Sequence, residues 1–332
     1  MVNSIRTPEI KSNVNGSTGT VPLLFVLALL TTIGVFASPV AAQQADAPDT
    51  IETFPVPAGA FSLAFDGANI WVTNWGFFSG TVTKLRASDG TVLGAFAVGS
   101  GPNGIAFDGA NIWTANNYDN TVTKLRASDG TVLGTFAVGD GPYGMTFDGQ
   151  NVWVANWFDG TVTKIRPSDG TILGTFPAGP LPDDLAFDGT NIWAVNEVSD
   201  SVTELRASDG MLVGTFEIPN TGTDLHGIVF DGANIWIGDS NKNRVIKLSA
   251  SDGTLHGRYR EGHVPWGIAF DGARIWVTNI EGNDVTRLSI RGLVEHRYPV
   301  GNDPRGILFD GTSIWVANYD DATVTKITPG QP

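Results

Sequence analysis

"FDGANIW", residues 65–71, decides the fold because the sequence repeats it. Further copies or close variants begin at residues 107, 147, 187, 230, 270 and 309. The final tryptophans of the seven copies are 42, 40, 40, 43, 40 and 39 residues apart. They are Trp71, Trp113, Trp153, Trp193, Trp236, Trp276 and Trp315. A period of about forty residues in strand-rich sequence is typical of the blades of a β-propeller.

Each repeat predicts four short strands. In the second repeat these are "GIAFD", "NIWTAN", "TVTKLRA" and "TVLGTFAVG", which are rich in Val, Ile, Thr and aromatic residues. Asp-Gly joins the first strand to the second, and Ser-Asp-Gly joins the third to the fourth, as tight antiparallel hairpins require. Ile112 and Trp113 are both apolar although they point to opposite faces of their strand. We therefore expect each sheet to be covered on both faces by neighbouring blades.

The two ends of the repeat region predict how the ring closes. The seventh repeat supplies three strand patterns, and the missing fourth pattern precedes the first repeat as "TIETFPVPAG", residues 50–59. An N-terminal strand that completes the C-terminal blade leaves no open sheet edge between the termini. The sequence therefore predicts an all-β fold, a seven-bladed β-propeller of four-stranded antiparallel blades, as one domain over residues 43–332.

The first 42 residues predict export. Arg6 and Lys11 precede the apolar run "VPLLFVLALLTTIGVF" and the segment "ASPVAA", in which Val40 and Ala42 occupy the small-residue positions that signal peptidase reads. We expect a signal peptide over residues 1–42, cleaved near Ala42, and a secreted or periplasmic location. The alternative is an uncleaved membrane anchor, because residues 21–42 have the length to span a bilayer.

The composition excludes several classes of partner and site. The formal net charge is −14 and the pI is near 4.5, whereas nucleic acid and anionic lipid require a basic surface. The chain has no cysteine, so disulfides and thiolate sites are absent. We expect a soluble monomer that binds no nucleic acid.

The repeats resemble a known group of proteins. "IWVTN", "VWVAN", "TVTKLRASDG" and "FAVGSGPNGIAF" are similar to the repeats of YVTN-type seven-bladed propellers, and more loosely to NHL repeats and streptogramin (virginiamycin) B lyases. The resemblance covers residues 50–328. It implies the fold but leaves the activity open, because these families include enzymes, binding modules and surface proteins.

Positions that differ among near-identical repeats are the candidates for function. The residue four places before the repeat phenylalanine, at the mouth of the innermost strand, differs in every blade. These mouth residues are Phe61, Asn103, Tyr143, Asp183, His226, Trp266 and Arg305. We expect them to converge at one end of the central channel as a ligand-binding site, with a solvated channel that holds no ligand as the alternative.

The second strand of each blade returns to the same face and ends in a polar residue. These residues are Asn74, Asn116, Asn156, Asn196, Asp239, Asn279 and Asn318. We expect the asparagines to tie the following loops through their side chains. The loops differ between blades and include Trp75, Phe77, Phe78 and Trp157, which favour binding if they are exposed.

Blades four and five form the most acidic part of this face. Its members are Asp183, Asp184, Glu197, Asp224, Asp239 and, nearby, His226. Oxygen ligands beside an imidazole suit Mg²⁺ or Ca²⁺, and the metal candidates are Asp183, Asp239 and Glu281. The alternative is an acidic rim without a metal.

The resemblance to streptogramin B lyases implies an enzymatic alternative. That family places a histidine at one strand mouth, a second histidine one blade later, and a magnesium-binding acid at the end of that blade's second strand. These positions fall on His226, Trp266 and Asn279, with His263 and Glu281 nearby. His226 is the candidate catalytic residue of a lyase or lactone hydrolase. We therefore expect an exported binding propeller for a small molecule, glycan or protein, with a metal-assisted lyase or lactonase as the alternative.

Overall fold

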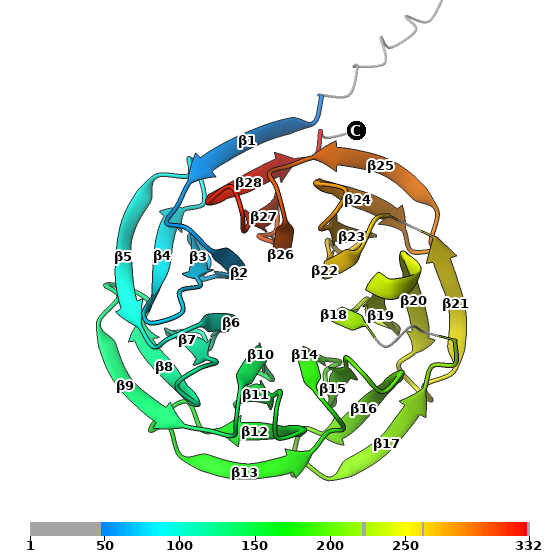
Figure 1. Cartoon of the computed structure of the whole chain (residues 1–332), viewed down its shortest axis with the longest axis horizontal. Helices are drawn as coiled ribbons and strands as arrows, with labels where there is room; N and C mark the ends of the chain where they lie inside the picture. The colour runs from blue at the N-terminus through cyan, green and yellow to red at the C-terminus, as the bar shows by residue number, and fades with distance from the viewer. Residues whose placement is uncertain (1–47, 221–223, 261, 331–332) are drawn as a thin grey trace, which may run out of the picture. The chain divides into compact units, whose positions relative to one another are not determined.

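A computed structural model describes residues 48–220, 224–260 and 262–330. Within these residues, 28 strands form seven antiparallel four-stranded sheets arranged in a ring (Figure 1). The predicted seven-bladed all-β propeller is confirmed. The expected signal segment, residues 1–42, lies outside the described residues. No helix in the described part of the chain is long and apolar enough to cross a membrane.

Each blade runs from an innermost strand at the centre of the ring to an outermost strand at its rim (Figure 1). Blade 1 comprises β2 (Ala60–Phe65), β3 (Asn69–Asn74), β4 (Gly80–Arg86) and β5 (Val92–Val98); blade 2 comprises β6 (Pro102–Phe107), β7 (Asn111–Asn116), β8 (Thr121–Arg126) and β9 (Val132–Ala137). Blade 3 comprises β10 (Pro142–Phe147), β11 (Val152–Asn156), β12 (Thr161–Ile165) and β13 (Ile172–Pro177); blade 4 comprises β14 (Pro182–Phe187), β15 (Asn191–Asn196), β16 (Ser201–Arg206) and β17 (Leu212–Glu217). Blade 5 comprises β18 (Leu225–Phe230), β19 (Asn234–Asp239), the 3-10 helix η1 (Ser240–Lys242), β20 (Arg244–Ser249) and β21 (Leu255–Arg260); blade 6 comprises β22 (Pro265–Phe270), β23 (Arg274–Asn279), β24 (Asp284–Ser289) and β25 (Val294–Pro299). Blade 7 comprises β26 (Pro304–Phe309), β27 (Ile314–Asn318), β28 (Thr323–Thr328) and β1 (Thr50–Pro55).

The repeated phrase is a hairpin turn joined to a buried tryptophan. Asp66 Oδ1 accepts the backbone N–H of Asn69, and Oδ2 accepts the indole N–H of Trp71 at 2.8 Å. Gly67 adopts φ +95°, a conformation that favours glycine. The same Asp–Trp hydrogen bond occurs in every repeat at 2.7–2.8 Å. One carboxylate therefore both closes the turn and accepts the hydrogen bond of the buried indole N–H.

Each tryptophan is a wedge between two blades. Trp71 is fully buried and packs with Ile112 and Leu125 of the next blade. Lys84 lies with Nζ 4.9 Å from the centre of the Trp71 ring, and the same Nζ donates to the carbonyl of Ala127 in blade 2 at 2.6 Å. Adjacent blades are thus joined by an apolar wedge and by a hydrogen bond from a buried cation.

The ring closes through β1, as the repeat pattern predicts. β1 pairs antiparallel with β28, which makes it the outermost strand of blade 7. Phe54 stacks on Trp315 at 5.8 Å and packs over Gly90 in the third-to-fourth strand turn of blade 1. Lys326 Nζ donates to the carbonyl of Ala87 at 2.8 Å. The first and last blades therefore meet through the same contacts as internal neighbours.

Candidate functional site

The mouth residues lie at a β-bulge. Each is the second residue of an innermost strand, where the pairing register shifts in all seven blades. In β10, Pro142 pairs with Asn156 and Met145 with Val154, so two residues oppose one. A bulge bends a strand and redirects the side chain beside it. Six of the seven divergent positions therefore lie within the bulge, and His226, which pairs with Gly238, lies directly before it.

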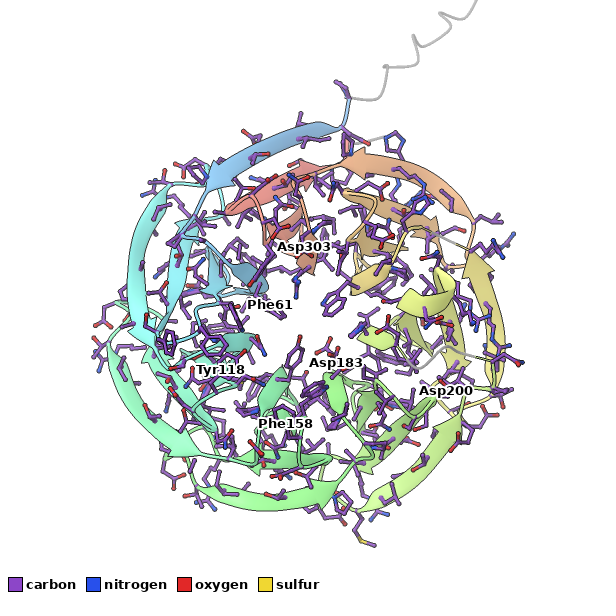
Figure 2. The ribbon with its side chains drawn as sticks, in the orientation of Figure 1. Phe61, Tyr118, Phe158, Asp183, Asp200 and Asp303 are labelled. Atoms are coloured by element: carbon purple, nitrogen blue, oxygen red, sulfur yellow. The ribbon has the colours of Figure 1, made fainter. Side chains whose placement is uncertain are left out.

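The structure places the predicted mouth residues around one end of the ring. Phe61, Tyr143, Asp183, Trp266 and Arg305 line a cavity of about 100 Å³, and Asn103 lines a second, wider cavity of about 280 Å³ that also includes Phe61, Tyr143 and Arg305. His226 joins the group through contacts with Asp183 and Trp266. Figure 2 shows Phe61 and Asp183 beside the central opening.

One side of the mouth is acidic, and we name Asp183, Asp184, Glu197 and Asp224 the acidic sector. His226 is buried within it, at 3% exposure. Its Nε2 hydrogen-bonds Asp224 Oδ1 at 3.0 Å, and its Nδ1 lies 3.3 Å from Asp183 Oδ1 without hydrogen-bond geometry. Its ring stacks on Trp266 at 3.7 Å. The imidazole is therefore held between two carboxylates and one aromatic face.

This environment favours the charged form of His226. Burial lowers the pKa of the imidazole, but the charge of Asp183, together with the charge of Asp224 and its hydrogen bond to Nε2, outweighs burial and raises the pKa to about 10. Burial, reinforced by the charge of Asp183, raises the pKa of Glu197. At neutral pH His226 is an imidazolium.

Stability should depend on His226 in a defined pH window. Its pKa rises from 6.5 to about 10 on folding, so its contribution is complete below pH 6.5 and disappears as the pH rises to about 10. Over that window its contribution to the free energy of unfolding should fall steadily as the pH rises. Denaturant titrations of wild type and His226→Gln should differ most near pH 6 and converge by pH 10. A gap that is constant or grows with pH would contradict the paired imidazolium.

Asp184 carries the acidic sector into the channel. The innermost strands have Gly104, Gly144, Gly227, Gly267 and Gly306 at the equivalent position, and Ser62 in blade 1. Added Cβ atoms at these glycines would meet atoms of the next blade at 2.1–2.5 Å. Burial, and then the charge of Asp183, raises the pKa of Asp184 to about 7. The sequence analysis recognised Asp184 as acidic but did not notice that it stands where the other blades have glycine or serine. Comparing the seven repeats at this position would have shown the difference.

The other side of the mouth is aromatic, and we name its seven rings the aromatic bowl. They are Phe61, Trp75, Tyr118, Tyr143, Trp157, Phe158 and Tyr319, from blades 7, 1, 2 and 3, and they line the wider cavity. Ring centroids are 5.9 Å apart for Phe61–Tyr143, 6.2 Å for Phe61–Tyr319, 5.8 Å for Trp75–Tyr118 and 4.7 Å for Trp157–Phe158. Figure 2 labels Tyr118 and Phe158 on this side.

The loop aromatics differ in exposure. Trp75 and Trp157 are half-buried, whereas Phe77 and Phe78 are exposed, Phe78 at 89%. Phe77 also stacks on Tyr118 at 4.7 Å, so Phe77 and Phe78 extend the rim of the bowl. Sequence reasoning missed Tyr118, Phe158 and Tyr319, although each is an aromatic residue in a variable loop.

Two polar side chains lie within the bowl. Asn103 is 3% exposed, and its Oδ1 has no hydrogen-bond partner among the described residues. An unpaired buried amide oxygen is costly, so a ligand donor would satisfy it. Arg305 lies 4.4 Å from the Tyr319 ring centre and 5.3 Å from that of Trp266, and its guanidinium donates to both oxygens of Asp303.

The three predicted metal candidates do not form one site. Asp239 accepts from Arg244 Nε at 2.7 Å, and Glu281 is exposed. Within the described ranges, the acidic and histidine groups close enough to share an ion are instead Asp183, Glu197 and His226, whose ligand atoms lie within 4.8 Å of one another. Asp239 lies apart from this group and pairs with Arg244, five residues along the chain.

The asparagines at the strand ends have a structural role. Asn116 Nδ2 donates to Thr121 and Thr123 on the third strand, at 3.0 and 2.8 Å, and Asn156 and Asn318 make equivalent bonds. These bonds join the second strand to the third. Two of the asparagines also tie loop backbone, as expected: Asn74 Nδ2 donates to the carbonyl of Pro57 at 3.0 Å, and Asn156 Oδ1 accepts the backbone N–H of Gly139 at 3.2 Å. Asn279 belongs to the same set, since it donates to Asp284 and Thr286.

Comparison with known protein families and with curated proteins finds no match for this sequence. Solved structures do match. Hydrazine synthase from Kuenenia stuttgartiensis is similar with a TM-score of 0.75 and 20% identity, over 82% of this chain and 96% of that one. Virginiamycin B lyase from Staphylococcus aureus has a TM-score of 0.73 and 19% identity, over 84% and 99%. A streptogramin B lyase has a TM-score of 0.69 and 19% identity, over 84% and 97%. At these identities the likeness shows the fold alone.

Proposed function

We propose that this chain is an exported propeller whose aromatic bowl binds a ring-bearing ligand. The observation that supports this most is the bowl itself, seven aromatic side chains gathered around one cavity at the divergent end of the ring. Tyr118 is 46% exposed and Phe158 59% exposed, although apolar surface is normally withdrawn from water. Export follows from the pattern of residues 1–42.

The physical form of the bowl suits a ring. Aromatic faces hold planar or pyranose rings over a large area with little loss of side-chain freedom, because each aromatic side chain has few rotatable bonds. The unpaired oxygen of Asn103 adds a directional contact within an otherwise apolar lining. The rigid blades beneath keep the cavity formed in the absence of ligand, which reduces the entropic cost of binding.

The test uses two neutral probes, 2-phenylethanol and the disaccharide cellobiose. At least one should bind, as measured by ligand-observed NMR, and Tyr118→Ala should weaken its affinity by about threefold to tenfold through the loss of one aromatic contact. Leu293→Ala is the matched control, because Leu293 is 66% exposed at the outer rim, before β25. Equal loss in both variants, or no binding by wild type, would contradict the proposal.

The alternative is a metal-assisted lyase or lactonase at the same face, favoured by the grouping of Asp183, Glu197 and His226. The residues at the positions implied by the lyase resemblance do not fit that family's magnesium site. Trp266 replaces the second histidine and stacks on His226, and Asn279 replaces the acid and bonds Asp284. Burial lowers the pKa of His226, but the nearby carboxylates raise it overall, which disfavours the neutral imidazole that a general base requires. Stabilisation by Mg²⁺ or Ca²⁺ that Glu197→Gln abolishes would favour the enzyme.

A further inference from the structure

The aromatic bowl and the acidic sector meet at one seam. Tyr143 and Trp157 stack at 6.3 Å, and the indole N–H of Trp157 donates to Glu197 Oε2 at 2.7 Å. The negative charge of Asp183 acts on Tyr143, whose pKa is raised well above 10, first by burial and then by that charge. A ring resting on Tyr143 and Trp157 would therefore have carboxylates at its edge.

The acidic sector carries more negative charge than its described neighbours neutralise. His226 is the cation that acts on both Asp184 and Glu197. Arg305, the other cation at the mouth, already bonds Asp303 through Nε and Nη2. Asp183 is 3% exposed, and its described charged partner is the same His226. One imidazolium thus faces several carboxylates, and partly buried negative charge without a partner is unfavourable.

An organic ammonium group complements this arrangement. Oxygen atoms of Asp183 and Glu197 lie within 4.8 Å of one another, close enough to accept from one ammonium group, and Tyr143 and Trp157 lie beside them. An ammonium needs carboxylate acceptors alone, and adjacent aromatic faces add cation–π attraction. The formal charge of −14 also attracts cations to the protein.

Resting on the proposed function, we propose that the mouth selects ring-bearing ligands that carry an ammonium group. The ring lies on Tyr143 and Trp157, and the ammonium donates to Asp183 and Glu197. The unpaired Oδ1 of Asn103, which lines the same cavity as Tyr143 and Trp157, accepts from a second donor of a longer ligand. Aromatic amines and amino sugars both have this chemistry.

Two matched probe pairs test the selection by isothermal titration. The first pair is 2-phenylethylamine and 2-phenylethanol, in which one ammonium replaces one hydroxyl. The second pair is the glucosamine disaccharide and cellobiose, in which one ammonium replaces the 2-hydroxyl of each of the two sugar units. In at least one pair we expect the ammonium member to bind about tenfold more tightly or better, as charge-assisted hydrogen bonds provide. The pair that shows this preference identifies the class, aromatic amine or amino sugar.

Variants that remove one carboxylate charge test which side chains cause the preference for the ammonium member. Asp183→Asn and Glu197→Gln should each reduce it to about threefold or less, measured as the ratio of the two affinities within a pair for the same variant. Asp320→Asn is the control, because Asp320 is an exposed acid on the same face beside the bowl. If Asp183→Asn does not fold, Glu197→Gln still tests the proposal, because Glu197 is only half-buried. High salt should also weaken the ammonium members alone in wild type.

The outcomes separate the two proposals. If the two members bind equally in every pair that binds, the ammonium preference is wrong and the ring-binding function stands. A preference that survives both Asp183→Asn and Glu197→Gln equally overturns the assignment to these carboxylates. If all four probes fail to bind wild type, both proposals fail.

Discussion

Replacing Trp153 with alanine is expected to lower the free energy of unfolding by about 3–5 kcal/mol. Trp153 is fully buried and packs with Leu185, Ile192 and Leu205 of the next blade, so its loss opens a cavity between blades 3 and 4. The substitution also removes the indole N–H that donates to Asp148 at 2.7 Å. Chemical denaturation followed by circular dichroism measures the change.

Two controls separate the wedge from an unspecific effect. Phe78→Ala should change stability by less than about 0.5 kcal/mol, because Phe78 is almost fully exposed. Trp153→Phe, which retains an aromatic ring but loses the N–H, should fall between wild type and alanine. A neutral Trp153→Ala would show that the repeated tryptophan does not hold neighbouring blades together.

Phe54→Ala is expected to cost about 2–4 kcal/mol, below the range for a fully buried phenylalanine because Phe54 is half-buried. Phe54 belongs to β1, stacks on Trp315 and covers Gly90, so it connects the first and last blades. Phe136 makes the equivalent contacts inside the ring, with Trp113 and with Gly170. The denaturation midpoints of Phe54→Ala and Phe136→Ala compare the contact that closes the ring with an equivalent contact between two internal blades.

The two variants should lose the same free energy of unfolding to within about 1 kcal/mol, because the two phenylalanines have similar surroundings. A wild-type-like Phe54→Ala beside a strongly destabilised Phe136→Ala would mean that β1 adds little to the ring. That result would contradict closure by the N-terminal strand.

The fold could be predicted because each blade repeats the same turn and the same buried tryptophan. Asp66, Gly67 and Trp71 stand within seven residues, and their turn, hydrogen bond and packing recur with little change around the ring. Closure was also predictable, since residues 50–55 match the outermost strands in pattern. Local chemistry and a fixed period are both visible in a single sequence.

The position of the mouth residues could be predicted, but most of their partners could not. His226 could be identified because it occupies the position that differs in every repeat. Its stacking on Trp266 and its contact with Asp183 join different blades and depend on the bulges, so the sequence does not show them. The link from Trp157 to Glu197 likewise joins two loops 40 residues apart. Repeat comparison identifies which residues differ, and the geometry of the loops decides which of them meet.

The metal candidates show the same limit. Acidity selected Asp239 and Glu281 along with Asp183, but Arg244 pairs with Asp239 and solvent surrounds Glu281. Glu197, which lies with Asp183 and His226, belongs to the acidic group that the sequence places on this face but was not among the three named candidates. Composition alone does not show which carboxylates the fold brings together.

The most direct test of the account is the position of a bound ring in crystals soaked with 2-phenylethylamine. We predict density for the phenyl group against Tyr143 and Trp157, with the amine directed at Asp183 and Glu197. A ring bound at the opposite end of the propeller or on its outermost strands, with the bowl empty, would contradict the claim that the divergent end of the ring is the binding site.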